Sequence, residues 1–351
     1  MSGRIFTPEQ AAGVVIVGGS TYPEHAESAA GAVGAEATDP HSKQFPNTEL
    51  TLEYADVSLR GKDVFIIQTD AAGRHRSLEG RADDAPWSVN DSIMETVIMV
   101  DAAHRASASS VTVVKPQFGY GRQDRKKHGR EPVSAIAHID IMAAVGMGRL
   151  LVIDAHCQQT ISHHPLADNL SAVDSLQVAT KGYLEGEGVD PEDVIFIAPD
   201  GGRLSLPEHF ADYLGGRIDV MAKTRDKEGG VKHAERVENV GGRTCVLVDD
   251  MIDTAGTLKS AIEILRRSGA EKIVVAATHG IFSEPALERL SEAEVDKIIV
   301  SDTVPQVKSA EALGSRLEVV KIAPIIGAAI FEIATNGSIS SIFRDGKAYS
   351  R

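Results

Sequence analysis

The stretch from Cys245 to Leu258 (CVLVDDMIDTAGTL) constrains what this chain can fold into more than any other. It opens with a short apolar, partly β-branched run, which is typical of a buried parallel strand. Two carboxylates and a small turn follow, and apolar residues then recur with the period of an α-helix that ends before Gly269. The apolar face predicted for this helix consists of Leu258, Ala261, Ile262 and Leu265. The pattern therefore predicts a strand, a turn and a helix in direct succession.

The turn between this strand and this helix predicts a binding site for an anion. Backbone N–H groups at the start of a helix have no intrahelical partner, and the helix dipole adds partial positive charge there. Asp249 and Asp250 can accept hydrogen bonds from vicinal hydroxyls, although an isolated Asp-Asp pair could also merely cap the helix. A phosphate site beside a diol clamp fits a sugar phosphate, most simply ribose 5-phosphate. The predicted sugar-phosphate residues are Asp249, Asp250, Asp253, Thr254, Ala255, Gly256 and Thr257.

Length and composition limit the class of protein. The chain has 351 residues, of which 42% are hydrophobic and 25% charged, so we expect a globular protein of two α/β domains. A formal net charge of −14 argues against nucleic-acid binding. The two cysteines, Cys157 and Cys245, are expected to be reduced thiols. No apolar run is long enough for a signal peptide or a bilayer span, so we expect a cytoplasmic protein with no membrane partner.

Apolar runs alternate with helical patterns along the whole chain, which predicts an α/β fold with mainly parallel sheets. Strands are predicted in a first set at 14–17, 63–68, 111–114 and 150–154, and in a second set at 194–197, 245–248, 273–277, 297–300 and 317–322. The two halves look alike in plan without a literal sequence repeat.

Three further elements are predicted from local signals. Residues 69–90 show no clean period and are expected to form a long loop, which is usually functional or mobile. Ser92 and Glu95 predict a capping box ahead of a helix that runs to about Arg105. A final helix is expected over 324–335.

Three polar segments could carry chemistry. The run from Phe118 to Lys127 combines aromatic and cationic residues after a strand, which favours polyphosphate binding over a merely solvated face. Asp154 and His156, at another strand end, could hold a divalent cation or orient a phosphate. Lys223–Arg225 opens a polar segment with two glycines, which predicts a mobile flap that closes over a transferring phosphate.

Taken together, these segments resemble the ribose-phosphate pyrophosphokinase family over nearly the whole chain. The resembling pieces are Phe45–Glu49, Tyr120–Asp124, Asp154–His156, Asp168–Leu170, Pro199–Gly202, Lys223–Arg225, Asp249–Thr257 and Thr278–Phe282. The resemblance implies two type I phosphoribosyltransferase-type domains, expected at 1–169 on the ATP side and at 170–351 on the ribose 5-phosphate side. It also implies a homo-oligomer of dimers or hexamers, with an active site at the domain junction that a neighbouring subunit commonly completes.

The resemblance further implies a role for each matching residue. The residues that would bind ATP are Phe45, Asn47, Glu49, Arg122, Gln123, Asp124 and His156. Those on the side of the magnesium ion would be His156, Asp200, Asp154 and Asp168. Lys223 and Arg225 would be the catalytic cations of the flap. The expected cofactor is Mg²⁺.

The implied reaction moves the diphosphoryl group of ATP to the C1 hydroxyl of ribose 5-phosphate and releases AMP. Some segments differ from the family pattern: 69–90 is longer, Asp200–Arg203 is shorter, and the stretch between His156 and Asp168 is shortened and carries His163-His164. These differences leave open the same chemistry on a larger acceptor such as ADP-ribose. A catalytically silent regulatory subunit is the other alternative, against which the retained Lys223, Arg225, Asp249 and Asp253 argue.

Overall fold

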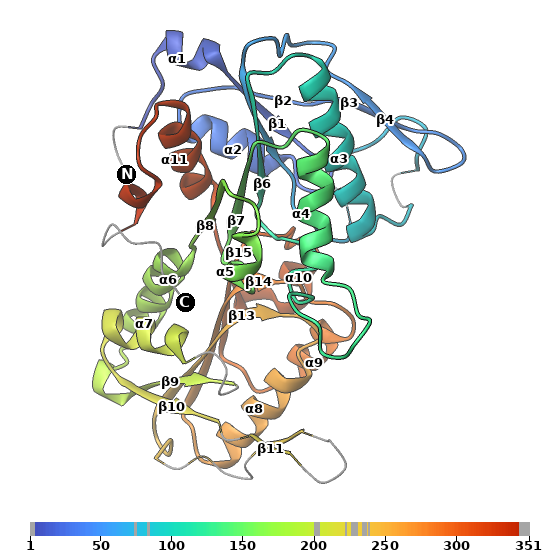
Figure 1. Cartoon of the computed structure of the whole chain (residues 1–351). Helices are drawn as coiled ribbons and strands as arrows, with labels where there is room; N and C mark the ends of the chain where they lie inside the picture. The colour runs from blue at the N-terminus through green and yellow to red at the C-terminus, as the bar shows by residue number, and fades with distance from the viewer. Residues whose placement is uncertain are drawn as a thin grey trace. The chain divides into compact units, whose positions relative to one another are not determined.

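The computed structural model describes residues 4–343 apart from 74–75, 83–84, 200–203, 222, 226–230, 234–236 and 238, and for 223–225 and 231–233 it describes the backbone alone. The described residues form two compact units (Figure 1). Unit 1 comprises 4–171, 303–305 and 322–343, and unit 2 comprises 172–302 and 306–321.

Unit 1 is built around a six-stranded parallel sheet with the order β2-β1-β5-β6-β7-β8. Figure 1 shows helices α2 and α11 on one side of this sheet and α3 and α4 on the other. The strands are β1 (Val14–Gly18), β2 (Ala37–Thr38), β5 (Asp63–Ile67), β6 (Ser110–Lys115), β7 (Arg149–Ile153) and β8 (Ala167–Leu170). The helices are α1 (Pro8–Gly13), α2 (Glu24–Ala32), α3 (Val89–Arg105), α4 (Ser134–Ala144), α5 (Gln158–Ile161), α11 (Ala323–Ala334) and the 3₁₀ turn η3 (Ile339–Ile342).

Unit 2 repeats this plan with a second six-stranded parallel sheet, ordered β10-β9-β13-β14-β15-β16. Its strands are β9 (Val194–Ala198), β10 (Arg217–Val220), β13 (Thr244–Ile252), β14 (Lys272–Gly280), β15 (Lys297–Ser301) and β16 (Leu317–Val320). Its helices are α6 (Val173–Gly186), α7 (Ser205–Leu214), α8 (Gly256–Arg267), α9 (Ala286–Glu292), α10 (Val307–Leu313) and the 3₁₀ turns η1 (Pro191–Asp193) and η2 (Gly314–Arg316).

The two sheets share one topology. In each sheet, the second strand in chain order pairs with one side of the first strand. The remaining strands follow one another in chain order on the other side of the first strand. Each unit also carries an antiparallel hairpin outside its sheet: β3 (His41–Gln44) with β4 (Leu50–Glu53), and β11 (Lys223–Arg225) with β12 (Val231–His233). The predicted α/β class with parallel sheets is confirmed, and the likeness of the two halves is a likeness of strand order.

The central strands carry apolar runs because both faces of each sheet are covered. Val64, Phe65, Ile66 and Ile67 of β5 are fully buried, as are Cys245, Val246 and Leu247 of β13. The strand order reverses between β1 and β5 in unit 1, and between β9 and β13 in unit 2. Ligands of open α/β sheets bind at such a switch point, beyond the carboxyl ends of the strands, so these two places are where a site is expected.

The final predicted helix, α11, belongs to unit 1, although it follows unit 2 in the chain. It lies beside α2 (Figure 1), and a Cβ added at Gly327 would come within 2.7 Å of the carbonyl oxygen of Ala29. Glycine therefore lets the two helices approach closely. The domains predicted at 1–169 and 170–351 remain a prediction; in the compact units the chain passes from one to the other at Ser171 and returns at Ile322.

Two local predictions are corrected. Helix α3 begins at Val89, and its capping box is formed by Ser88 and Asp91, so Ser92 and Glu95 lie one turn inside the helix and are buried. Strand β13 runs on to Ile252 instead of ending before the two carboxylates, because its pairing with β14 continues that far.

Both cysteines are free thiols, as predicted. Within the part of the chain that the structure describes, no helix is both long and apolar enough to span a bilayer.

Candidate active site

The strand–turn–helix predicted from the sequence lies at the switch point of unit 2. Strand β9 pairs with β13 only as far as Leu247, whereas β14 stays paired to Ile252. The last residues of β13 therefore project past β9 at the carboxyl edge of the sheet. The predicted face of α8 is buried as expected, with Leu258, Ala261, Ile262 and Leu265 all in the core.

The two carboxylates after the apolar run differ in their exposure. Successive side chains of a strand point to opposite faces, and both Asp249 and Asp250 lie within β13. Asp250 is buried, while Asp249, Met251 and Asp253 are partly exposed on the alternate positions. Asp249 and Asp253 are therefore more accessible than Asp250, and the predicted contact of Asp250 with the sugar stays a prediction.

The turn itself has the form of an anion site. Ala255 adopts a left-handed conformation (φ 56°) and occupies the N-cap position of α8, where its methyl group cannot cap the helix. The first amides of α8 are thus left without a side-chain cap at the positive end of the helix dipole. Thr254 and Thr257 are exposed beside them. The turn can therefore present amide and hydroxyl donors to a phosphate.

One cation beside the turn was missed from the sequence. Arg289 of α9 donates a hydrogen bond of 2.8 Å to the carbonyl oxygen of Thr254, and its Nη1 lies 3.3 Å from where a Cβ of Gly256 would be. The residue sits far along the chain from the turn, in a segment without a motif. Its charge adds to the positive potential that the helix dipole provides.

Of the predicted segment Asp200–Arg203 and the predicted flap, the structure describes only part of the flap. Asp200–Arg203 lie outside the described residues. Lys223 and Arg225 belong to β11, whose backbone pairs with β12 (Lys223 with His233, Arg225 with Val231). The predicted glycines of the flap, Gly229 and Gly230, lie outside the described residues.

The corresponding switch point of unit 1 is filled by the chain's own side chains. The buried carboxylate of Glu95 accepts hydrogen bonds from the Ser20 backbone amide (3.0 Å), the Ser20 hydroxyl (2.5 Å) and the Gln68 amide (2.5 Å). A Cβ at Gly19 would lie 2.3 Å from Cδ of Gln68, so the loop after β1 is in direct contact with the loop after β5. The predicted loop of 69–90 ends at Ser88, because α3 begins at Val89. Its Trp87 donates a hydrogen bond to the hydroxyl of Thr21.

The predicted nucleotide segment lies one strand further along, after β6. The segment from Phe118 turns at Tyr120 (φ 62°), and a Cβ placed on Gly121 would lie 3.7 Å from Cβ of His156. Two predicted ATP-binding pieces, Tyr120–Asp124 and His156, are thus neighbours in space. Gln123 accepts a hydrogen bond of 2.6 Å from the hydroxyl of Ser134, while Arg122 is exposed.

The residues expected near magnesium that the structure describes do not form one compact cluster. Asp154 accepts a hydrogen bond of 2.7 Å from the hydroxyl of Ser171, and Asp168 forms an ion pair of 2.5 Å with Arg149. Among the described residues, no group of three or more His, Cys, Asp and Glu side chains gathers to hold a metal ion. Magnesium usually keeps several waters and is held by one or two protein carboxylates together with substrate phosphates, so such a set fits an ion that is held mainly by ATP.

Phe45, Asn47 and Glu49 form the tip of the β3–β4 hairpin. The Phe45 amide donates to the Glu49 carbonyl, and Thr48 takes a left-handed conformation (φ 74°), which makes the tip a tight turn. All of these side chains are exposed, and Phe45 is 42% accessible. In Figure 1 the hairpin projects beside the sheet of unit 1, where the tip can meet a ligand or another chain.

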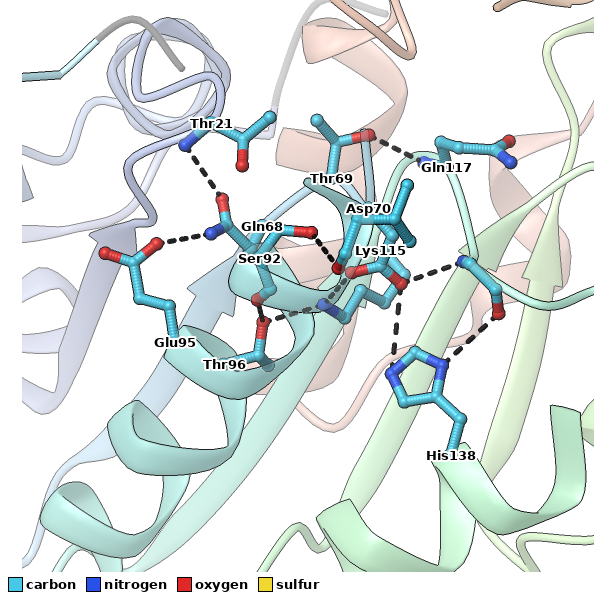
Figure 2. A network of polar contacts seen from close by, with 12 residues as sticks. Thr21, Gln68, Thr69, Asp70, Ser92, Glu95, Thr96, Lys115, Gln117 and His138 are labelled. Atoms are coloured by element: carbon cyan, nitrogen blue, oxygen red, sulfur yellow. Dashed lines mark hydrogen bonds and ion pairs between the residues drawn. The ribbon is translucent and has the colours of Figure 1, made fainter. Parts of the chain in front are cut away.

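A buried ionic cluster behind the nucleotide segment was also missed. Lys115, at the end of β6, and Asp70, in the loop after β5, form an ion pair of 2.6 Å in which neither side chain is exposed. His138 of α4 lies beside them (Figure 2), with Nε2 3.8 Å from Asp70. Burial lowers the pKa of Lys115, against the opposing effect of Asp70, and burial likewise lowers the pKa of His138. Nothing in the sequence around Lys115 predicted this contact, because the lysine stands at the end of an apolar run that is typical of a strand.

Comparisons with known proteins agree with the geometry. Residues 14–146 match the model described as the N-terminal domain of ribose phosphate pyrophosphokinase, and 202–344 match the phosphoribosyl synthetase-associated domain. The chain is 37% identical to a ribose-phosphate pyrophosphokinase of Streptomyces coelicolor over 93% of this chain and 94% of that protein. It is 35% identical to that of Mycobacterium leprae over 95% of this chain and 96% of that protein.

A solved structure shows the same arrangement of elements. The phosphoribosylpyrophosphate synthetase of Mycobacterium smegmatis superposes with a TM-score of 0.78 at 33% identity, covering 92% of this chain and 99% of that one. The likeness therefore extends over both units and is not confined to a shared nucleotide-binding motif.

Proposed function

The chain belongs to the ribose-phosphate pyrophosphokinase family, and from that premise we propose that it transfers the diphosphoryl group of ATP to the C1 hydroxyl of ribose 5-phosphate. The products are phosphoribosyl pyrophosphate and AMP, which makes the protein an enzyme of nucleotide biosynthesis. The observation that carries the proposal is the uncapped turn between β13 and α8, which lies at a switch point as a sugar-phosphate site requires.

The sugar phosphate binds at this turn. Amides at the start of α8 and the hydroxyls of Thr254 and Thr257 bind the 5-phosphate, while Asp249 and Asp253 accept hydrogen bonds from ring hydroxyls. Arg289 supports the turn from behind. These contacts hold the C1 hydroxyl in one orientation, and positioning of this kind accounts for much of phosphoryl-transfer catalysis.

The nucleotide binds to unit 1. Arg122 and Gln123 contact ATP, His156 lies on the side of its phosphates, and Asp124 supports the segment. In the reaction, the C1 oxygen bonds to the β-phosphorus, the bond from that phosphorus to the oxygen of the α-phosphate breaks, and the hydroxyl proton is released. Lys223 and Arg225 stabilise the charge that grows on the transferring group. His156 and Asp200 would hold Mg²⁺ together with the triphosphate, and the ion would neutralise phosphate charge.

We also propose that the working protein is a homo-oligomer. The exposed tip of the β3–β4 hairpin, with Phe45 in solvent, supports a role for these residues that another copy completes. Light scattering at assay concentration tests this: a monomer with full activity contradicts it. A cytoplasmic location stays a prediction from the sequence.

The deciding experiment measures AMP release from ATP and magnesium with a panel of acceptors. Ribose 5-phosphate is expected to support AMP release, whereas ribose without the phosphate is expected to be inactive because the turn then has no anion to bind. A preference for ADP-ribose would assign the same chemistry to the larger acceptor. No AMP with any acceptor, from protein that binds ATP, would identify a silent subunit and refute the proposal.

A further inference from the structure

The buried cluster in unit 1 joins side chains of β6, of α3, of α4 and of the loop after β5. Lys115 Nζ donates to Oδ1 of Asp70 at 2.6 Å and to the hydroxyl of Thr96 at 2.7 Å. The other oxygen of Asp70, Oδ2, accepts a hydrogen bond of 2.8 Å from the backbone amide of Gly119. His138 Nδ1 lies 3.3 Å from the carbonyl oxygen of the same glycine. Both polar groups of the Gly119 backbone are therefore held by this cluster.

Stability alone does not account for a buried ion pair at this place. Desolvation of two charges usually cancels their attraction, and apolar residues of similar volume are often as stable or more so. A buried charge pair does impose one geometry, because each charge must keep its partners. Here the lysine fixes Oδ1 of Asp70, and the orientation of the carboxylate then fixes where Oδ2 can receive the Gly119 amide.

The protonation of His138 agrees with this arrangement. Burial lowers its pKa, Asp70 opposes that shift, Lys115 lowers the pKa further and the contact with Gly119 raises it, and the net shift favours the neutral ring. Because the Gly119 carbonyl oxygen can only accept, the ring proton is assigned to Nδ1, which donates to it. The ring also stacks on Phe118, with centroids 4.7 Å apart and an interplanar angle of 10°.

Gly119 in turn begins the segment that carries the proposed nucleotide contacts. A Cβ at this position would lie 3.0 Å from Cβ of Asp70 and 3.0 Å from Cγ1 of Val89, so the segment is held tightly against the loop after β5. The next residue, Tyr120, is fixed at a left-handed turn and donates its hydroxyl proton to Asn90 at 2.6 Å. The path from Gly119 to Arg122 is thus short and stiff, and a shift of Gly119 displaces Arg122.

We propose that Asp70, oriented by Lys115, is a positioning residue for ATP that acts through the Gly119 backbone on the segment carrying Arg122 and Gln123. The inference rests on the proposed function in one respect: it takes ATP as the nucleotide that the segment carrying Arg122 and Gln123 binds. The anchoring of Gly119 is a property of the free protein and can be measured without turnover.

The test needs variants that remove the anchor without leaving a buried charge alone. Asp70→Val/Lys115→Met removes both charges at similar volume, so the fold is expected to survive, yet the Gly119 amide loses its acceptor. Asp70→Asn is the conservative variant, since one amide oxygen can serve either Lys115 or Gly119 but not both. Glu95→Gln is the matched control: it alters a buried carboxylate of the same unit that holds Ser20 and Gln68 instead of the segment.

Three measurements are made on each variant. Hydrogen exchange follows the Gly119 amide, calorimetric titration gives the affinity for ATP with magnesium and no sugar, and AMP release gives KM for each substrate. The double variant is expected to lose protection at Gly119 while β6 stays protected. It is also expected to bind ATP roughly tenfold more weakly, as for loss of one charge-assisted hydrogen bond, with KM for ribose 5-phosphate within about twofold. Asp70→Asn should lie between this variant and the wild type.

Two results would overturn the inference. One is continued protection of Gly119 in the folded double variant; the other is lost protection with wild-type affinity for ATP. Equal weakening of ATP binding in Glu95→Gln would also overturn it, since any disturbance of unit 1 would then suffice. If the wild-type protein binds ATP but releases no AMP with ribose 5-phosphate, the proposed function fails, and the exchange and titration results still decide the inference.

Discussion

The guanidinium group of Arg289 donates a hydrogen bond of 2.8 Å to the carbonyl oxygen of Thr254, so a side chain of α9 holds the turn that precedes α8. The contact joins a partly exposed arginine to the backbone of the proposed phosphate site, and it places a positive charge beside Gly256. Arg289 therefore shapes the turn and adds to its positive potential.

Replacing this arginine should weaken binding of the sugar phosphate. Arg289→Met is expected to raise KM for ribose 5-phosphate by roughly tenfold, the loss of one hydrogen bond to a charged group, and to leave KM for ATP nearly unchanged. Steady-state AMP release checks this. Arg243→Met is the matched control, because Arg243 also binds a backbone carbonyl, that of Glu192 at 2.9 Å, but stands at the amino end of β13. Equal effects of the two variants would contradict the assignment.

Asp253→Ala should lose activity mainly through the sugar phosphate. Asp253 directly follows β13. Like Asp249, it is partly exposed and occupies one of the alternate positions along the chain. Loss of a hydrogen-bonded carboxylate is expected to lower kcat/KM for ribose 5-phosphate by roughly tenfold to a hundredfold. Glu263→Ala, at an exposed position of α8, provides the comparison and should behave as wild type. Unchanged kinetics of Asp253→Ala would show that the site is misassigned.

Lys223→Ala should affect the transition state more than substrate binding. A cation that meets the transferring phosphate only when water is excluded is worth about 3–4 kcal/mol, by analogy with the donors of an oxyanion hole. We therefore expect turnover to fall about a hundredfold to a thousandfold, with KM for ATP within a few-fold. Near-normal turnover combined with weak ATP binding would instead make Lys223 a binding residue. Single-turnover kinetics with saturating ATP separates the two cases.

The two thiols should differ in reactivity. Cys245 is fully buried in β13, and burial raises its pKa to about 12, so its reactive thiolate is not formed at ordinary pH. Cys157 is partly exposed. Titration with an aromatic disulfide reagent at pH 8 is expected to modify Cys157 alone in the native protein and both thiols in urea. Modification of Cys245 at the native rate of Cys157 would disagree with the core described for unit 2.

Acid should destabilise unit 1 through His138. Burial holds the pKa of His138 below its ordinary value of 6.5, with Lys115 lowering it further and Asp70 opposing the shift. Below pH ~6.5 the unfolded chain binds a proton at this site more readily than the folded chain, so the free energy of unfolding falls as the pH is lowered through the folded pKa. Urea unfolding between pH 7.5 and 5 measures the slope. His138→Phe, which keeps a ring against Phe118, should flatten it, and an unchanged slope would count against the assignment.

The elements around the sugar-phosphate turn could be predicted because their signals are local. One short stretch of sequence contains all of these signals: the apolar run of β13, the buried face of α8, and Arg266, Arg267 and Gly269 at the end of this helix. Periodicity and capping depend on neighbours a few residues away, so they can be read without knowing the fold. The same rules located most strands of both sheets.

Local rules failed where several residues could satisfy the same pattern. The Ser92–Glu95 spacing fits a capping box, but Ser88 and Asp91 take that role one turn earlier and leave Glu95 inside unit 1. Its carboxylate then meets Ser20 and Gln68, which are distant in sequence. Similarly, pairing with β14 extended β13 beyond its apolar run and placed Asp249 and Asp250 on opposite faces.

What the sequence by itself determined is most strands of the two sheets, the helices α3, α8 and α11, the α/β class and the strand–turn–helix that can bind a phosphate. Only the tertiary structure decided that Asp70 and Lys115 form a buried pair with His138, that Arg289 holds the turn at Thr254, and that α11 returns to unit 1. The physical reason is the range of the forces involved. Helices and strands follow from contacts within a few residues, whereas a charge can be buried only when a partner from a distant segment compensates its desolvation.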